Sequence, residues 1–487
     1  MTAPFSYRAP LPRVAVIGGM MAYFESIMAP GFRDDRRANM MELTRGLGGC
    51  ATLLDLGLWA EAGDEEAIGQ RLTQARADVL LLAPTMAWPP ERIAALAAES
   101  GLPIVLACGH DLDHVGDSFD MRELCRHSHN VGTTMMGAML RRLSPHRPPI
   151  TIVGFLDDPA FHERLRQAVM AAALARRSKG LRLGRLGAPM PGYAHVGLTP
   201  EEASAAGLAL VDVALDEWSD RVASVTGAEI AHFANERLPR LLPRQAVWRN
   251  SPDLDRALRL GLALDRLADD HALDCGAIAC RGPFGDGLPQ GAISCLATAL
   301  CATTGRPFAA TGDLVTALAM WVGRHLGGAT LYCELDAIDR DRDAFLVANT
   351  GEGDFAWTPS GGRFAIHDAS VHSGRAVPGV VLQQDLTAGP ATALGFALHP
   401  GRSERLTLIA MEGKIGEPAR TALKVTSGWF HADARPAASA FEAWANAGAT
   451  HHVALSRGAL AEAVGWIGML TDSPVIKITS AGVEHDQ

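Results

Sequence analysis

Short, mostly apolar segments separated by helical stretches run through the first half of the chain. Residues 13–17 (RVAVI) stop at Gly18 and Gly19, Ala77–Pro84 reads ADVLLLAP, and Leu102–Ala107 reads LPIVLA. Each run has the length of a strand and the continuous apolar character of a strand covered on both faces. Strands that alternate with helical segments at this spacing predict a parallel, doubly wound sheet.

The pattern then starts again. Ile150–Gly154 (ITIVG) is typical of a strand, and Asp158–Leu174 has the periodicity of an amphipathic helix. A further helix is expected near Pro200, because Thr199 followed by Glu202 three residues later fits a capping box. These segments predict a second α/β domain after the first.

The last third of the chain changes character. From about Gly327 onward, short apolar runs such as Thr330–Glu334, Ala344–Ala348 and Leu406–Ala410 lie between turn residues. This spacing predicts an antiparallel β domain, either a small barrel or a sandwich. The expected fold class is therefore α/β, with two doubly wound parallel-sheet domains followed by a mainly antiparallel β C-terminal domain. The predicted domains span residues 1–145, 146–326 and 327–487.

Composition and charge exclude some classes of binding partner and indicate the compartment. The net charge of −10 is spread over 487 residues, and nucleic-acid binding would need a clustered basic face. No segment reaches the roughly 18 apolar residues of a membrane span, and the N-terminus lacks the apolar region of a signal peptide. The eight cysteines have no CxxC spacing, which favours buried free thiols in a reducing compartment. A cytoplasmic protein without nucleic-acid or membrane partners is expected.

Two further motifs give little support for a cofactor site or a metal site. Gly18 and Gly19 follow a predicted strand, but they lack the GxGxxG pattern and the acidic partner of a dinucleotide site. His127 and His129 would share one face if they lay in a strand, yet no third ligand type stands nearby in the sequence. We therefore expect these two histidines to be surface residues.

Four polar segments of the second half carry more chemistry together than each does alone. A carboxylate inside an apolar strand, as at Glu334, is costly unless it is paired or bound to a cation. Adjacent histidines on a strand point to opposite faces, so only one of the pair 451–452 is expected at any one site. The four segments are Ala310–Leu314 (ATGDL), Leu331–Asp336 (LYCELD), Val347–Asp354 (VANTGEGD) and Gly448–His452 (GATHH).

Two interpretations of these segments stay open. Glu334 and one histidine could form half of a site for a hard cation, with Asp313 or Glu352 completing it. Alternatively, Glu334 could belong to an ordinary buried salt bridge or to a pair on a surface strand.

In the order of its features, the chain resembles the L-fucose isomerase and L-arabinose isomerase family. Two α/β domains, a GDL loop leading to a helix, a strand that carries an acid, and an HH pair near the end follow one another as in that family. Gln383–Gly395 (QQDLTAGPATALG) resembles the family's GPVT region, and Gly413–Gly416 its EGE region. The opening segment around ADVLLLAP resembles the family's first domain.

The resemblance implies a metal-dependent aldose–ketose isomerase. Family members use a divalent ion, usually manganese, that grips two substrate oxygens while two carboxylates move a proton through an enediol. The resemblance further implies a carbohydrate-metabolising homo-oligomer, a trimer or hexamer, acting on a small polyhydroxylated substrate. Its pocket would lie between the second and C-terminal domains, closed by the first domain of a neighbouring subunit.

The family's site residues fall on specific positions of this chain. The second family acid matches Glu334, the last metal ligand matches His452, and the Asp of the GDL loop matches Asp313. Asn349 stands where fucose isomerases also have Asn and arabinose isomerases have a metal-binding His. Glu352 matches an acid typical of arabinose isomerases.

The chain departs from the family pattern at Thr311, where the first family acid stands. A hydroxyl cannot act as a general base at neutral pH, and loss of one of two acid–base groups costs about 10²–10⁴ in rate. Asp313, two residues on, is the expected substitute. The predicted catalytic residues are Glu334, Asp313 and Thr311; the metal ligands are Glu334 and His452; and the substrate contacts are Asn349, Glu352, His451, Tyr332 and Trp88, with His110, Arg281 and Gln290 as further loop candidates.

Three functions remain open at this point. The first is an isomerase that acts on a monosaccharide or polyhydroxy acid through a metal-stabilised enediolate. The second is another enolate-type reaction in the same pocket, such as epimerisation, decarboxylation or carbon–carbon cleavage. The third is a non-catalytic sugar-binding protein.

Overall fold

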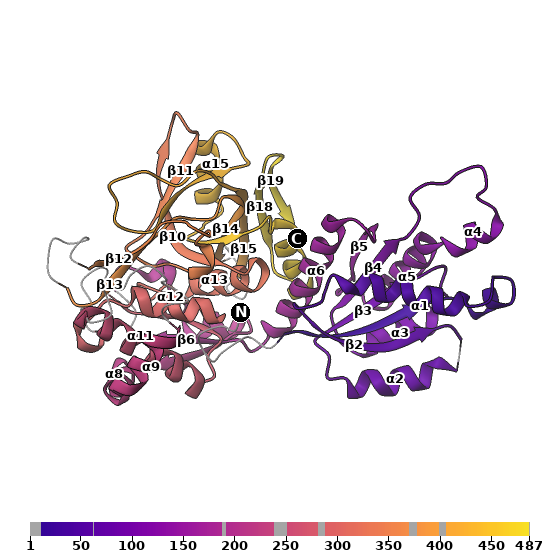
Figure 1. Ribbon diagram of the computed structural model, residues 1–487, viewed down its shortest axis with the longest axis horizontal. Coiled ribbons are helices and arrows are strands. Elements are labelled where there is room, and N and C mark those ends of the chain that lie inside the picture. The colour runs from indigo at the N-terminus through magenta and orange to yellow at the C-terminus, as the bar shows by residue number, and fades with distance from the viewer. Residues whose placement is uncertain are drawn as a thin grey trace. The chain divides into compact units, whose positions relative to one another are not determined.

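The computed structural model describes residues 11–61, 63–187, 191–237, 251–280, 288–369, 377–398 and 406–486. The chain divides into two compact units, which Figure 1 shows in colours that run along the sequence. The N-terminal unit comprises residues 10–177 together with 465–472. The C-terminal unit comprises the described residues within 178–464 and 473–486.

The N-terminal unit is a parallel five-stranded sheet of order β2-β1-β3-β4-β5. Alternate residues of each strand face opposite sides, so Val14 and Val16 pack with α1 and α6, whereas Ala15 and Ile17 pack with α2, α3 and α5. The strands are β1 Arg13–Gly19, β2 Thr52–Trp59, β3 Val79–Pro84, β4 Ile104–His110 and β5 Ile150–Phe155. The α-helices are α1 Phe32–Arg45, α2 Asp64–Gln74, α3 Glu91–Glu99, α4 Met121–Arg126, α5 His129–Leu143 and α6 Pro159–Arg177, and a short 3-10 helix, η1, spans Ala22–Ser26.

The first sheet extends beyond residue 145, where the sequence pattern places the start of a second domain. Ile150–Phe155 pairs in parallel with β4, with Ile150 opposite Val105, and α6 then covers the same sheet. The alternating burial of β5 is that of an edge strand. The strand with which the strand–helix pattern starts again, at residue 150, is therefore the last strand of the first sheet.

The C-terminal unit begins with a second parallel sheet, of order β7-β6-β8-β9. Its helix α7 starts with the predicted capping box, in which the Thr199 hydroxyl and the Glu202 carboxylate each accept a backbone N–H. The strands are β6 Arg182–Leu186, β7 Ala209–Val213, β8 Cys275–Ile278 and β9 Phe308–Ala309. The α-helices are α7 Pro200–Ala205, α8 Leu215–Ser224, α9 Gly227–His232, α11 Pro252–Asp270, α12 Cys295–Thr304 and α13 Leu314–Gly327, with short turns η2 Ala194–Val196, η3 Phe233–Arg237 and η6 Pro289–Gly291.

The rest of this unit is the predicted antiparallel β region. Strands β14, β17, β10, β11, β16 and β15 follow one another and close through the β14–β15 pairing, which makes the sheet barrel-like. The parallel β15–β18 pairing then extends it to β19. The elements are β10 Thr330–Asp339, β11 Ala344–Ala348, η7 Phe355–Trp357, β12 Phe364–Asp368, β13 Val380–Gln384, β14 Gly389–Leu398, β15 Leu406–Ile415, β16 Ser427–Ala432, α15 Ala437–Asn446, β17 His452–Arg457, β18 Val475–Thr479 and β19 Gly482–Asp486. Helix α16, Ala461–Thr471, begins in this unit, and its residues from 465 onward belong to the N-terminal unit.

The fold class predicted from the sequence is thus confirmed at the level of parallel-sheet α/β layers followed by an antiparallel β region. All eight cysteines are free, and six of them are buried, as their apolar surroundings in the sequence indicate. Among the described helices, none combines the length and the apolar composition needed to cross a membrane.

Candidate functional site

The residues that the sequence singles out converge where the second sheet meets the β region of the C-terminal unit. Thr311 lies in the turn between β9 and α13, Glu334 lies on β10, and His452 begins β17. Strands β10 and β17 are antiparallel neighbours, and Glu334 is the direct partner of His452. Directly opposed residues project from the same face of a sheet, and Glu334 Oε1 accordingly lies 3.5 Å from His452 Nε2.

Both histidines of the pair approach this carboxylate, which corrects the expectation that only one would. His451 precedes the first residue of β17, so the alternation of a strand does not apply to it. Its Nε2 lies 3.9 Å from Glu334 Oε1, and its ring is 3.8 Å from that of His452 between centroids. Ligand atoms of Glu334, His451 and His452 all lie within 4.8 Å of one another.

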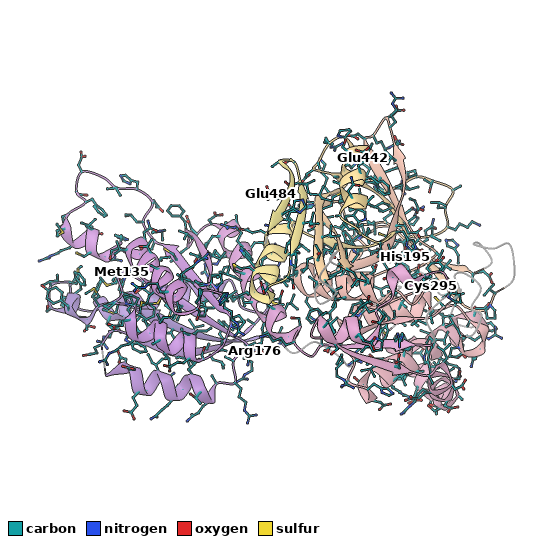
Figure 2. All side chains as sticks on the ribbon, turned by 180° about the vertical axis from the view of Figure 1, so that it is seen from behind. Met135, Arg176, His195, Cys295, Glu442 and Glu484 are labelled. Carbon is teal, nitrogen blue, oxygen red and sulfur yellow. The ribbon has the colours of Figure 1, made fainter. Side chains whose placement is uncertain are left out.

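These separations suit one divalent cation. Two donors that each lie about 2.1 Å from a tetrahedral ion are about 3.4 Å apart. The second nitrogen of each ring has a partner on the side away from Glu334. His452 Nδ1 donates to Asp313 Oδ2 at 2.8 Å. His451 Nδ1 lies 3.1 Å from Nε2 of His195, which is labelled in Figure 2. Partners of this kind orient metal-binding imidazoles. Burial lowers the pKa of His451 to about 4, which keeps its ring neutral and able to coordinate.

Asp313 has a different place from the one that a substitute acid needs. It is fully buried, its Oδ1 caps α13 by accepting Thr316 N at 2.7 Å, and its Oδ2 accepts from His452. Both carboxylate oxygens are therefore occupied on the side of His452 that faces away from Glu334. The geometry gives Asp313 a positioning role, in which it leaves His452 Nε2 deprotonated and free to bind a metal.

Asp313→Asn is expected to weaken divalent-metal binding by about 10–100-fold, as for other partners behind a metal ligand. An amide can present its NH₂ group to His452 Nδ1, which would then accept a hydrogen bond, so that the ring proton moves to Nε2. Titration of the metal-stripped protein with Mn²⁺ measures the loss. Asp313→Glu supplies the conservative comparison, and unchanged affinity in Asp313→Asn would show that the carboxylate does not orient the ring.

Tyr332 also supports His452 from behind. Its hydroxyl lies 2.7 Å from His452 Nδ1 and 3.1 Å from Thr311 Oγ1, and it donates to Ala310 O at 3.3 Å. The side chain is buried, and burial raises its pKa well above the ordinary value. Tyr332 therefore acts on the imidazole, and its burial argues against direct substrate contact.

Thr311 adopts a strained backbone at the centre of this arrangement. Its φ of 61° is in the left-handed region, which β-branched residues rarely adopt. Strain of this kind gathers at functional sites, where the surroundings enforce it. Its hydroxyl binds Tyr332, so Thr311 joins the network behind the histidines and supplies no carboxylate.

A second carboxyl that the sequence analysis did not single out lies next to Glu334. Asp336 is two residues along β10, at the bulge where the pairing with β11 shifts register, and its side chain is hydrogen-bonded to Glu334. Burial raises the pKa of both carboxyls. The signal was present in the sequence as two acids with strand spacing in LYCELD.

Glu334 and Asp336 open onto a cavity of about 700 Å³. This volume is in the range of small-molecule sites. Asn349 and Thr350, which follow β11, line it, and Lys424 adds an exposed cation. The Asn349 Nδ2 is buried and has no hydrogen-bond partner among the described residues, so its donor capacity is unused.

Glu352 lies on the loop after β11 and is buried. Burial raises its pKa, opposed in part by its own backbone N–H and by His452, and its carboxylate accepts from Thr350 Oγ1 at 3.4 Å. A buried acid without a paired cation destabilises the ionised folded state. Its position beside His452 brings a further negative charge to the site.

Glu352→Gln is expected to raise the free energy of unfolding of the metal-stripped protein by about 0.5–2 kcal/mol at pH 7, as is common when a functional charge is removed. Because the folded-state pKa is raised, the wild type loses stability as pH rises from the unfolded-state pKa through the folded-state value. The advantage of the variant should therefore vanish below about pH 4. Urea unfolding at several pH values measures it, and an equal advantage at pH 3 and pH 7 would exclude a charge effect.

The remaining predicted contacts lie elsewhere. Trp88 belongs to the core of the N-terminal unit, where its ring lies over Gly19 and occupies the space that a Cβ there would need. His110 ends β4 of the same unit and is bonded to Asn130. Gln290 is exposed in η6, and Arg281 lies outside the described residues.

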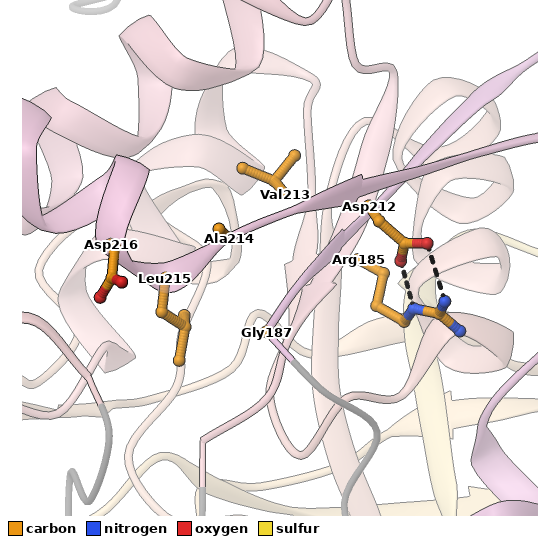
Figure 3. A pocket seen from close by; sticks show the side chains of 7 residues that line it. All are labelled: Arg185, Gly187, Asp212, Val213, Ala214, Leu215 and Asp216. Carbon is orange, nitrogen blue, oxygen red and sulfur yellow. Dashed lines mark hydrogen bonds and ion pairs between the residues drawn. The ribbon is translucent and has the colours of Figure 1, made fainter.

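A different cavity, of about 590 Å³, lies at the carboxyl ends of β6 and β7 (Figure 3). Arg185 and Asp212 line it and form a two-bonded ion pair, with Nε–Oδ1 at 2.5 Å and Nη2–Oδ2 at 3.0 Å. In this pair each side chain compensates the charge of the other. None of the predicted site residues lines this cavity. The cavity beside Glu334 is therefore the stronger candidate.

No protein-family model matches the chain, and no curated protein matches it. The resemblance to fucose and arabinose isomerases thus stays an expectation drawn from the order of motifs. The geometry of Glu334, His451 and His452 is the structural indication of function.

Proposed function

We propose that the chain is a divalent-metal-dependent enzyme of the aldose–ketose isomerase type, acting on a monosaccharide or polyhydroxy acid. The observation that carries the proposal is the convergence of one carboxylate and two imidazoles, Glu334, His451 and His452, of which Glu334 lines a cavity of small-molecule size. A divalent ion bound there would stabilise the negative charge of an enediolate, and manganese is the expected metal.

The paired carboxyls supply the proton-transfer groups. In an aldose–ketose isomerisation, the C2 proton moves to C1 and a hydroxyl proton moves between the two oxygens, so no other reactant is consumed. Asp336 is the carboxyl next to Glu334, and two hydrogen-bonded acids with raised pKa values can divide the roles of acid and base. Asp336 thereby takes the place that the sequence pattern assigns to Asp313.

The cavity also favours a class of substrate. Lys424 places a positive charge on the wall beside Asn349 and Thr350, which supply amide and hydroxyl groups. A polyhydroxy acid offers hydroxyls to the polar groups and a carboxylate to Lys424. Sugar acids are therefore the first substrates to test.

The proposal is tested by incubating the protein with Mn²⁺ and a panel of sugar acids, aldoses and ketoses in D₂O. Incorporation of deuterium at C1 or C2, followed by NMR, is the expected result for at least one substrate. Asp336→Asn should lower exchange by about 10²–10⁴. Absence of exchange across the panel, with Mn²⁺ shown to be bound, would refute the proposal.

A second candidate function is another enolate-type reaction, namely epimerisation, decarboxylation or carbon–carbon cleavage. It is favoured by Thr311, which supplies no acid, and by the use of both Asp313 oxygens in holding α13 and His452. Such reactions need charge stabilisation beside a carbonyl and a single proton-transfer group. Product analysis by mass spectrometry in the same screen separates them, since cleavage and decarboxylation change the mass of the product.

A further inference from the structure

A second cluster of metal-ligating side chains lies in the N-terminal unit and includes no residue of the proposed active site. It joins Asp111, directly after β4, with His127 and His129 at the junction of α4 and α5. One ligand atom from each of the three lies within 4.8 Å of the others. The expectation that these two histidines are surface residues is wrong, because His129 is fully buried and the His127 side chain is only 8% exposed.

The reason lies in the local structure. His127 caps the C-terminus of α4 and His129 is the first residue of α5, so the two do not alternate as they would in a strand. The third group arrives from β4, sixteen residues before His127 in the sequence, and becomes a neighbour only through the sheet. The carboxyl edge of a parallel sheet is where such groups meet.

Two imidazole nitrogens in this cluster lack hydrogen-bond partners. Nδ1 of His127 and Nδ1 of His129 are both buried, and neither has a partner in the described part of the chain. Asp111 Oδ1 lies only 3.0 Å from His127 Nδ1, but the contact lacks the geometry of a hydrogen bond. Buried polar atoms without partners are rare and point to a missing ion or water.

The surrounding side chains hold the donors in place. His127 Nε2 lies 3.1 Å from Glu123 Oε2, which is the carboxylate–histidine arrangement found behind metal ligands. Arg36, fully buried, donates from Nη2 to Asp111 Oδ2 at 3.2 Å and leaves Oδ1 facing the histidines.

The charges of the cluster leave room for a cation. Asp35, Asp111 and Glu123 carry three negative charges, whereas Arg36 and Arg126 carry two positive ones. Arg36 also approaches His129 Nε2 at 3.4 Å, but its Nη1 hydrogens are directed to the carbonyls of Thr85 and Arg126 at 2.8 and 3.3 Å. With His127 uncharged, one negative charge is therefore uncompensated within this network.

We propose that Asp111, His127 and His129 form a second divalent-cation site, one that takes zinc or a similar nitrogen-preferring ion. Two imidazoles and one carboxylate are the donor set of three-ligand zinc sites. Glu334, His451 and His452 offer the same donor set, for which the resemblance to the isomerase family implies manganese, so the Glu334→Gln substitution is needed to separate the two sites. It is independent of the proposed function, because it shares no residue with that site.

The test uses the metal-stripped full-length chain carrying Glu334→Gln, titrated with Zn²⁺ alone against a competing chelator. One equivalent of Zn²⁺ is expected to bind, and anomalous diffraction at the zinc edge should place it between His127 and His129. Adding Asp111→Asn and His127→Asn together should weaken binding at least about 100-fold, and Glu123→Gln alone by about 10–100-fold. His110→Asn is the matched control, since its ring lies 5.2 Å from that of His129 between centroids but is not one of the three donors.

His129 is left unchanged in these variants because it is fully buried, and thermal unfolding without zinc checks that each variant is folded. If the double variant does not fold, Glu123→Gln decides, since that side chain is partly exposed. Zinc binding that is equal in Glu123→Gln and His110→Asn, or absent from the Glu334→Gln chain, overturns the proposal. The cluster would then be an ion-pair network only.

Discussion

Glu334→Gln is expected to remove Mn²⁺ binding from the C-terminal unit and to lower turnover by about 10²–10⁴. The substitution keeps the shape of the side chain but replaces the charged oxygen that lies 3.5 Å from His452 and 3.9 Å from His451. It also removes one member of the hydrogen-bonded pair with Asp336. Metal content after dialysis, and deuterium exchange on the best substrate, measure the two effects separately.

The matched control is Asp339→Asn, which removes a carboxylate from the same strand but at a partly exposed position paired with Arg342. That variant should bind Mn²⁺ and turn over substrate as the wild type does. His452→Ala should lose the metal as Glu334→Gln does, because it removes the imidazole opposite Glu334 in the β10–β17 pairing. Full metal content in both Glu334→Gln and His452→Ala would eliminate the proposed site, whatever the activity.

The layers of the fold could be predicted because they depend on local patterns. Runs such as ADVLLLAP are buried on both faces, and β3 at Val79–Pro84 is accordingly fully buried. The boundary at residue 145 could not be obtained in this way, because an edge strand such as β5 and the first strand of a new sheet have the same local sequence character. Only the pairing of β5 with β4 distinguishes the two cases.

The site was predictable to the level of Glu334 and His452, since a carboxylate in an apolar strand and a histidine before another both need a partner. The role of Asp313 was not, because proximity in sequence to Thr311 does not reveal that α13 and His452 already use both of its oxygens. Whether His451 approaches Glu334 depends on whether β17 begins at residue 451 or 452, and sequence patterns do not locate the end of a strand to within one residue. The Asp111 cluster depends on contacts between segments that the sequence keeps apart.

One buried ion pair fixes the loop that carries Asn349 and Glu352. Asp354, at the end of this loop, is fully buried and pairs through Oδ2 with Arg324 Nη1 of α13 at 2.9 Å. The same carboxylate accepts the backbone N–H of Thr330 through Oδ2 and that of Ala356 through Oδ1, each at 2.9 Å. Through these bonds Asp354 connects α13, the first residue of β10 and the loop after β11, which are the elements that hold the candidate site.

Asp354→Ala is therefore expected to lower the free energy of unfolding of the C-terminal unit by about 3–5 kcal/mol, the usual cost of leaving one member of a buried ion pair alone. The cost arises because Arg324 and two backbone N–H groups lose their acceptor in a site from which water is largely excluded. Asp354→Asn should cost less, since an amide oxygen can still accept one of these bonds. Urea unfolding measures both variants, and Asp341→Ala, at an exposed position, should change stability by less than about 0.5 kcal/mol. If Asp354→Ala proved as mild as Asp341→Ala, the loop would have to be held by other contacts, and the cavity beside Glu334 would not depend on this ion pair.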